Sequence, residues 1–458
     1  MAEAPKVCTD VSFGQALRFW LRLGFISFGG PAGQIALMHE ELVVRRRWIS
    51  ERRFLHALNY CMLLPGPEAQ QLATYLGWLM HRTWGGVVAG VLFVLPSLFI
   101  LIALSWVYLR FGQVPAVAAV LWGLKPAVVA LVVQAAWRLG SRTLRHPLLA
   151  GIAVLSFVLI AGPGLGFPWI VLGAALAGMA GARWVPGVFV GPSPASAQQA
   201  AAQASAEQPT VAGQAVNSAW IDDGTPTPPH ARFSRARLVR VVIVCLALGG
   251  AAAAGLALAM GPQSAYLAMA RFFTQAALVT FGGAYAVLPY VVQGAVEQHG
   301  WLSTAQMMDG LALGETTPGP LIMVVAFVGF LGGWQQALLG PDALAAAGVL
   351  GAGVATFFTF LPSFLFILAG GPLVEATRGR LGFTAPLTAI SAAVVGVIAS
   401  LGLFFAVHTV WPRGFGQAID LPALMLAVGA TAALLRWKLS PVKVLAACAL
   451  SGWVLNGL

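Results

Sequence analysis

Long apolar runs define the architecture that the sequence predicts. A helix needs about 20 apolar residues to cross a bilayer. Runs of that length recur at 84–108, 114–137, 238–260, 346–370 and 381–407. Two further runs, 148–182 and 418–457, are split by Gly and Pro, and each predicts a pair of spans. The pattern therefore predicts an all-α polytopic membrane protein.

Composition supports this class. Of the 458 residues, 59% are hydrophobic and only 9% are charged, whereas about a quarter of the residues of soluble domains are charged. The first ten residues lack the charged region and cleavage site of a signal peptide. We therefore expect the spans themselves to direct membrane insertion.

Two apolar segments, 12–44 and 54–80, are interrupted by Gly and Pro at 29–31 and 65–67. Proline removes a backbone donor and clashes with the preceding helical turn, so each segment is interpreted as two half-helices around a break. Arginine clusters at 45–53 and 138–145 predict that both stretches are cytoplasmic, and the two clear spans 84–108 and 114–137 lie between them. The second segment must then return to the side it came from, which predicts a re-entrant hairpin.

The two halves of the chain share these features in one register. Pairs separated by 253 residues are Phe28 and Phe281, Trp48 and Trp301, and the Pro-Gly-Pro strings at 65–67 and 318–320; Leu-Pro-Ser recurs after 266 residues, at 95–97 and 361–363. Such internal repetition indicates a duplication. Each half is expected to hold two re-entrant broken hairpins followed by about four transmembrane helices.

Charge in matching loops predicts how the halves are oriented. The first-half loop at 45–53 carries five arginines, whereas the matching loop at 293–303 has no Lys or Arg. Because cytoplasmic loops are enriched in Lys and Arg, the repeats are predicted to have inverted topology, joined by the span at 238–260. Paired broken helices in inverted repeats are typical of secondary transporters with a site near the membrane midplane.

These boundaries divide the chain into three parts. Residues 1–182 form the N-terminal transporter repeat, and 238–458 form the linking helix and the C-terminal repeat. Between them, 183–237 is rich in Ala, Gln, Ser and Pro. Because such a composition buries too little apolar surface to offset ordering entropy, we expect a flexible cytoplasmic linker.

Other function classes fit the sequence less well. The net charge is +11, but no basic stripe lies on a soluble domain, so nucleic acid is not an expected partner. The four cysteines are scattered without metal or disulfide spacing. No nucleotide-binding motif is present, so neither ATP nor another cofactor is implied. The expected partners are the lipid bilayer and a transported solute, with a homodimer left open.

The strings at 28–36, 64–73, 281–285 and 315–320 resemble the chromate ion transporter family in its long, two-half form. The resemblance implies export of chromate from the bacterial cytoplasm across the inner membrane, coupled to the electrochemical gradient. A transporter of sulfate or another tetrahedral oxyanion is the alternative. An intramembrane enzyme acting on a phosphorylated lipid is a distant alternative, because the chain lacks the nucleophile or metal cluster that it would need.

The breaks suit a doubly charged tetrahedral anion. Half-helix N-termini present unpaired N–H groups and a positive dipole end, and glycine lets a ligand approach the backbone closely. The candidate anion cradle consists of Gly29, Gly30, Gly33, Gly66, Gly282, Gly283 and Gly319. The alternative is that these glycines only permit close helix packing.

Ionisable and hydroxyl residues add further candidates. Arg18 and Arg271, at equivalent places before the two Phe-Gly-Gly strings, would attract the dianion or snorkel to the headgroups. Lys125 lies within a span and would be a fixed positive charge in the pathway. Thr316 and Thr317 would donate hydrogen bonds to the anion or satisfy the broken backbone.

Two acidic residues flank the Pro-Gly-Pro strings, Glu68 directly after the first and Glu315 three residues before the second. A carboxylate beside an anion pathway repels the anion unless it carries a proton. Glu68 and Glu315 are therefore candidate proton carriers that couple transport to proton movement. The alternative is that they cap half-helices.

Overall fold

The computed structural model describes residues 10–28, 30–189, 219–223, 225–226, 228–281, 283–376, 384–415 and 417–456. The helices of the first half are α1 (Phe13–Ile26), α2 (Gly30–His39), η1 (Glu40–Arg45), α3 (Glu51–Leu63), α4 (Glu68–Phe111), α5 (Pro115–Thr143), α6 (Pro147–Ala161), α7 (Phe167–Trp184) and α8 (Pro186–Phe189). A short η2 (Pro229–Ala231) and the long α10 (Arg235–Met260) follow. The second half contains α11 (Ala265–Val279), α12 (Ala284–Val292), η3 (Gln293–Gln298), α13 (Thr304–Thr316), η4 (Leu321–Met323), α14 (Val324–Gln335), η5 (Pro341–Ala343), α15 (Leu344–Ala376), α16 (Thr384–Val410), α17 (Leu421–Leu435) and α18 (Pro441–Asn456).

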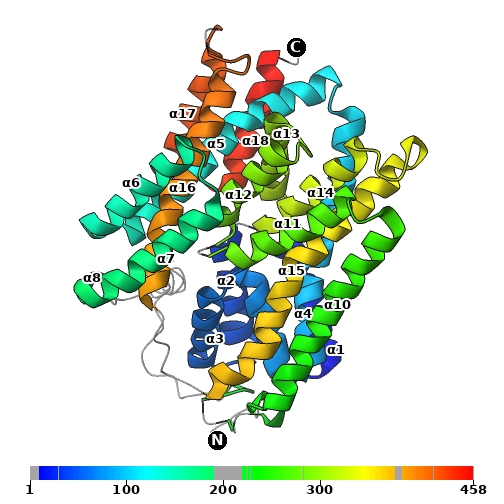
Figure 1. The fold of residues 1–458 in the computed structure, drawn as a ribbon, viewed down its shortest axis with the longest axis vertical. Coiled ribbons are helices and arrows are strands. Elements are labelled where there is room, and N and C mark those ends of the chain that lie inside the picture. The colour runs from blue at the N-terminus through cyan, green and yellow to red at the C-terminus, as the bar shows by residue number, and fades with distance from the viewer. Residues whose placement is uncertain are drawn as a thin grey trace, which may run out of the picture.

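The protein is an all-α polytopic membrane protein (Figure 1). All five predicted spans fall on helices long and apolar enough to cross a bilayer. Each of the two runs predicted as a pair of spans contains two helices, α6 with α7 and α17 with α18. Helices α6, α17 and α18 have only 15, 15 and 16 residues, so that these runs cross the bilayer twice stays a prediction. Among the described residues the only β pairing is an isolated bridge between Ile49 and Ile221.

The predicted helix breaks are confirmed. The backbone angle φ is +71° at Gly30 and +115° at Gly66, and in the second half it is +101° at Gly283 and +108° at Gly319. L-residues rarely adopt these angles, whereas glycine does so without steric cost. Glycine therefore permits the sharp change of direction at each break.

Element boundaries recur at the register of the sequence repeat. The π-helices η1 and η3 start and end 253 residues apart, and so do α3 and α13. The long α4 is interrupted by non-helical angles at His81 and Arg82, where the second half divides into α14 and α15. The duplication is therefore visible in the helices. The orientation of the two repeats across the membrane stays a prediction.

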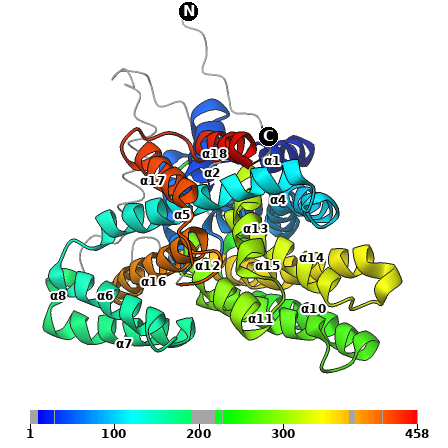
Figure 2. The same cartoon turned by 90° about the horizontal axis from the view of Figure 1, so that it is seen from above.

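The two halves interdigitate. Helix α5 packs against α17 and α18 of the other half, and α16 packs reciprocally against α6 and α7, as the view in Figure 2 shows. Helices α4 and α15, one from each half, also pack on each other. One buried cluster accordingly contains residues from both halves. The breaks of one half are thus brought against the other half.

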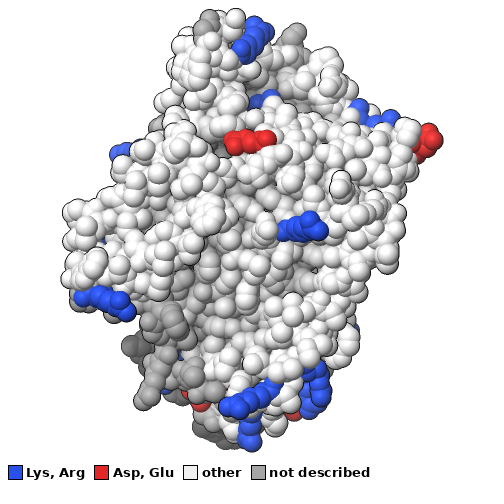
Figure 3. Space-filling model, in the orientation of Figure 1, with Lys and Arg blue, Asp and Glu red and all other residues white. Residues whose placement is uncertain are grey.

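The outer surface is suited to lipid. Helix α10 buries only Cys245, while Leu258 is 88% exposed and Met425 on α17 is 68% exposed. The space-filling view shows a largely uncharged face, with several basic side chains at its lower end and single charged side chains scattered over the rest (Figure 3). Exposing apolar side chains in this way is unfavourable in water but not in the hydrocarbon of a bilayer.

Candidate functional site

The four helix breaks meet in two pairs, and each pair joins the two halves. The Gly66 N–H donates to the Thr280 carbonyl oxygen at 2.9 Å, and the Gly319 N–H donates to the Ser27 carbonyl oxygen at 2.7 Å. Gly66 and Gly319 are repeat equivalents, and so are Ser27 and Thr280. Each Pro-Gly-Pro turn is therefore bound to the backbone just before the Phe-Gly-Gly string of the opposite half.

The shared Leu-Pro-Ser strings complete these contacts. A Cβ added at Gly66 would lie 2.7 Å from Ser363 Oγ, and one added at Gly319 would lie 2.6 Å from Ser97 Cβ. Real Cβ atoms do not approach other atoms so closely. Close packing between the halves therefore accounts for glycine at these two positions.

Gly30 and Gly283 have different surroundings. A Cβ added at either residue would meet nothing within 4 Å. Both lie at the N-terminal end of a helix, α2 and α12 respectively. A Cβ at Gly33 would lie 2.9 Å from the Phe28 carbonyl oxygen. Two further cradle candidates, Gly29 and Gly282, lie outside the described residues. Open space thus borders one glycine of each Phe-Gly-Gly string.

Buried amide side chains add neutral donors at the two pairs. Gln34 Nε2 donates to the Gly319 carbonyl oxygen at 2.5 Å, and Gln71 Nε2 donates to the Pro65 carbonyl oxygen at 2.7 Å. Sequence reasoning missed Gln34. Within the described part of the chain, Ser97 Oγ is buried without a hydrogen-bond partner. Buried polar atoms of this kind are rare and call for an explanation.

The acidic candidates lie close to the breaks. Glu68 is 5% exposed and begins α4 directly after the first Pro-Gly-Pro turn. The Glu315 carboxylate, on α13, accepts a hydrogen bond from the Tyr285 hydroxyl on α12. Both carboxyl groups are therefore held by the elements that form the breaks.

The remaining candidates are more scattered. The Thr316 and Thr317 hydroxyls donate to carbonyl oxygens of their own helix at 2.9 Å, so both satisfy the backbone where α13 ends. Arg18 on α1 and Arg271 on α11 have exposed side chains. The structure therefore keeps both arginines on the outer surface, where they can reach headgroups.

Lys125 lines a cavity of about 190 Å³ where the end of α4, the start of α5 and the start of α13 meet. The cavity is also lined by Gln306 and Asp309 of α13 and by Tyr108 of α4. The Tyr108 hydroxyl donates to Asp309 Oδ2 at 2.9 Å. Sequence reasoning missed Asp309, although an acidic residue within an apolar helical segment is a site candidate by default.

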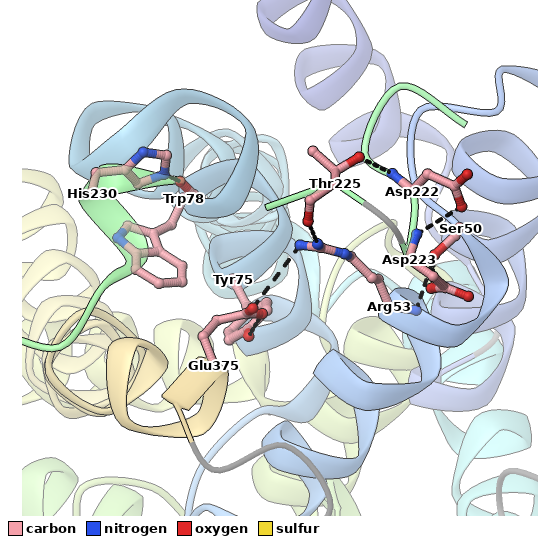
Figure 4. Close-up of polar contacts among 9 residues, drawn as sticks. All are labelled: Ser50, Arg53, Tyr75, Trp78, Asp222, Asp223, Thr225, His230 and Glu375. Carbon is pink, nitrogen blue, oxygen red and sulfur yellow. Dashed lines mark hydrogen bonds and ion pairs between the residues drawn. The ribbon is translucent and has the colours of Figure 1, made fainter. Parts of the chain in front are cut away.

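A second polar cluster joins the halves near the start of α3. Arg53 Nη1 lies 4.0 Å from Glu375 Oε2 of α15, and both side chains are buried. The Tyr75 hydroxyl of α4 donates to Glu375 Oε1 at 2.7 Å. Arg53 also donates to the Thr225 carbonyl oxygen. Figure 4 shows this chain of contacts from Thr225 through Arg53 to Glu375 and Tyr75.

The described part of the predicted linker covers this cluster. The Ile221 N–H donates to the Trp48 carbonyl oxygen, and the Ser50 N–H donates back to the Ile221 carbonyl oxygen, both at 3.0 Å. Ser50 Oγ donates to Asp223 at 2.7 Å. His230 contacts the Trp78 carbonyl oxygen at 3.0 Å. Residues 219–231, which we call the strap, therefore lie against the N-terminal repeat where the structure describes them.

Duplicated, broken helices that pair across an interdigitated helical body define a polytopic membrane transporter. The family described as chromate transporter matches residues 14–179 and again residues 267–453. The chain belongs to the chromate transporter family, and the double match agrees with the duplication.

Individual relatives cover nearly the whole chain. A chromate transport protein of Pseudomonas aeruginosa is 32% identical over 99% of this chain and 95% of its own length. A chromate transport protein of Cupriavidus metallidurans is 28% identical over 96% and 92%. A probable chromate transport protein of Synechococcus elongatus is 26% identical over 93% and 91%. No solved structure matches the chain.

Proposed function

We propose that the protein is a secondary active transporter that exports chromate across the bacterial inner membrane. The observation that carries this proposal is the reciprocal pairing of the breaks, Gly66 with Thr280 and Gly319 with Ser27. A site built equally from both repeats can be exposed to either side when one repeat moves against the other. The relatives named as chromate transport proteins support chromate as the anion.

The breaks offer the donors that a dianion requires. The first turn of a helix generally has N–H groups without intrahelical partners, and Gly30 and Gly283 leave space beside the first turns of α2 and α12. Neutral backbone donors bind an oxyanion without holding it by excess positive charge, so that it can leave again. Because Arg18 and Arg271 have exposed side chains, they would attract the anion from the surface or bind headgroups, and they do not line the breaks.

The membrane potential supplies a driving force for export. With the inside negative, the exit of each negative charge is favoured by about 2.3 kcal/mol per 100 mV. Glu68 and Glu315 are the proposed proton carriers, since both lie beside the breaks. Transport by proteoliposomes in which the pH gradient and the potential are imposed separately measures each contribution. Export that follows the potential alone would exclude proton coupling.

The test of the cradle compares three glycines with similar backbone angles. Gly30→Leu and Gly283→Leu each place a side chain into the open space and should abolish chromate transport. Gly164 is the matched control, because its φ is +69° and a Cβ there also meets nothing within 4 Å, but it lies in the loop between α6 and α7. Gly164→Leu should retain transport. Normal transport by both cradle variants would contradict the proposed site.

Export of sulfate is the second candidate function, because sulfate has nearly the same size and charge as chromate. The donors at the breaks do not separate the two anions by their chemistry. A wild-type protein that moves labelled sulfate as fast as chromate under an imposed potential would favour this alternative.

A further inference from the structure

The cavity at the start of α13 combines a cationic and an acidic side chain. Lys125 and Asp309 both line it, together with the amide side chains of Gln113 and Gln306. A water molecule needs about 10–15 Å³ of such volume, so a cavity of about 190 Å³ has room for a tetrahedral oxyanion and several waters. This combination of charges restricts the kind of oxyanion that can bind.

Asp309 has hydrogen-bonding capacity to spare. The residue is 4% exposed, and Oδ2 accepts a hydrogen bond from the Tyr108 hydroxyl. The other oxygen, Oδ1, is buried and has no partner among the described residues. An ionised carboxylate can only accept hydrogen bonds. A ligand next to Asp309 must therefore bring a donor of its own.

Lys125 places a second requirement on the ligand, a negative charge. Its ammonium group carries three donors, and no Asp or Glu oxygen of the described chain lies within 4.0 Å of it in an ion pair. A negatively charged ligand would satisfy it. The two residues together call for an anion that also carries a hydrogen-bond donor.

Tetrahedral oxyanions of similar size differ in this property. Near neutral pH part of the chromate carries one proton as hydrogen chromate, and phosphate and arsenate also carry protons, whereas sulfate carries none. A hydroxyl of the protonated anion can donate to the carboxylate. Sulfate would instead place its oxygens against acceptor oxygens with no hydrogen between them, which discriminates strongly against it.

We propose that this cavity is a selectivity site for a singly protonated tetrahedral oxyanion, with Lys125 binding its charge and Asp309 accepting the hydrogen bond from its hydroxyl. This inference rests on the proposed function, that the protein transports a tetrahedral oxyanion. The inference extends that function by stating how the protein distinguishes hydrogen chromate from sulfate.

Asp309→Asn tests the assignment, because an amide can donate to an unprotonated oxygen. In proteoliposomes the wild-type protein should transport chromate in the presence of excess sulfate, and less rapidly as the pH rises through neutrality. Asp309→Asn should make sulfate a better competitor by about tenfold or more and flatten the pH profile. Asp342→Asn is the control, since Asp342 is an exposed carboxylate of η5 outside the cavity lining. It should behave as wild type.

A binding measurement keeps the test independent of transport. Phosphate, a protonated probe, should raise the melting temperature of the purified wild-type protein more than sulfate does, and Asp309→Asn should reverse that order. Lys125→Gln should remove both effects. Equal stabilisation of the wild-type protein by phosphate and sulfate, or unchanged selectivity in Asp309→Asn, would overturn the selectivity site. A wild-type protein that moves no oxyanion at all would instead refute the proposed function.

Discussion

Equivalent places in the two repeats have the same arrangement of helices but differ in their side-chain contacts. By the repeat register, Gln306 on α13 corresponds to Arg53 on α3, and Leu109 on α4 corresponds to Glu375 on α15. At the α3 end, Arg53 and Glu375 form a buried ion pair beneath the strap. At the α13 end, the corresponding helices line the cavity.

On this comparison we infer that side chains, and not the shared backbone, determine which end of the molecule is closed. A pair of opposite charges between α3 and α15 draws the two halves together, whereas Gln306 and Leu109 cannot form such a pair. By the predicted topology the closed end is cytoplasmic. Export would then require the ion pair and the strap contacts to open so that the anion can enter.

The largest expected effect comes from breaking the ion pair. Arg53→Met removes the cationic partner of the buried Glu375 carboxylate, which should destabilise the protein by about 3–5 kcal/mol. The matched control is Gln306→Met at the equivalent place of the open end, where no charge is left unpaired. Thermal unfolding in detergent compares the two variants.

A double variant sharpens this test. Replacing both partners, Arg53→Met with Glu375→Leu, removes the buried carboxylate as well as its cationic partner and should restore much of the lost stability. Equal destabilisation by Arg53→Met and Gln306→Met would show that the two ends do not differ in the way proposed.

The next effect concerns the strap. Ile221 is 5% exposed and belongs to the same buried cluster as Cys61 of α3, which is 0% exposed. Ile221→Ala removes packing of the strap and should raise the rate at which a water-soluble reagent labels Cys61 by about tenfold or more. The other three cysteines are replaced by serine for this experiment.

A substitution on the lipid-facing surface is the control for the strap. Ile243 on α10 is 59% exposed, and Ile243→Ala should leave the labelling of Cys61 unchanged. Fast labelling of Cys61 in a protein whose strap is unchanged would mean that residues 219–231 do not seal the α3 end.

Sequence patterns predicted the spans, the breaks and the duplication because each depends on local periodicity or on Gly and Pro. The hydrogen bonds that Gly66 and Gly319 donate to the opposite half could not be predicted from sequence, since they depend on how the repeats interdigitate. Arg53 belonged to an arginine-rich loop and was interpreted only as a topology signal. Its burial depends on Glu375, more than 300 residues away.

The strap and the cavity show two further limits of prediction from sequence. Trp220 and Ile221 are isolated apolar residues in a polar segment, too few to predict a docked strand-like contact. Asp309 was visible as a lone acid in an apolar segment, but its partner Tyr108 lies in the other half. Local sequence therefore indicated where unusual chemistry lies and did not indicate with which residues it is shared.

The smallest expected effect is a pH dependence of the strap contact. Partial burial lowers the pKa of His230 below the usual histidine value of about 6.5, an effect that its hydrogen bond to the Trp78 carbonyl oxygen partly offsets. A histidine in an undocked strap would take up a proton first. The docked contact is therefore at full strength above about pH 6.5 and weakens as the pH falls below that value.

The labelling rate of Cys61 measures this dependence when it is divided, at each pH, by the rate in His230→Gln, because the ratio cancels the titration of the thiol itself. The ratio should be constant above about pH 6.5 and should rise by less than about tenfold below it, since half-burial keeps the shift small. A ratio that falls on acidification would mean that protonated His230 binds the strap more tightly, and the α3 end would then be closed by charge at His230 as well as at Arg53.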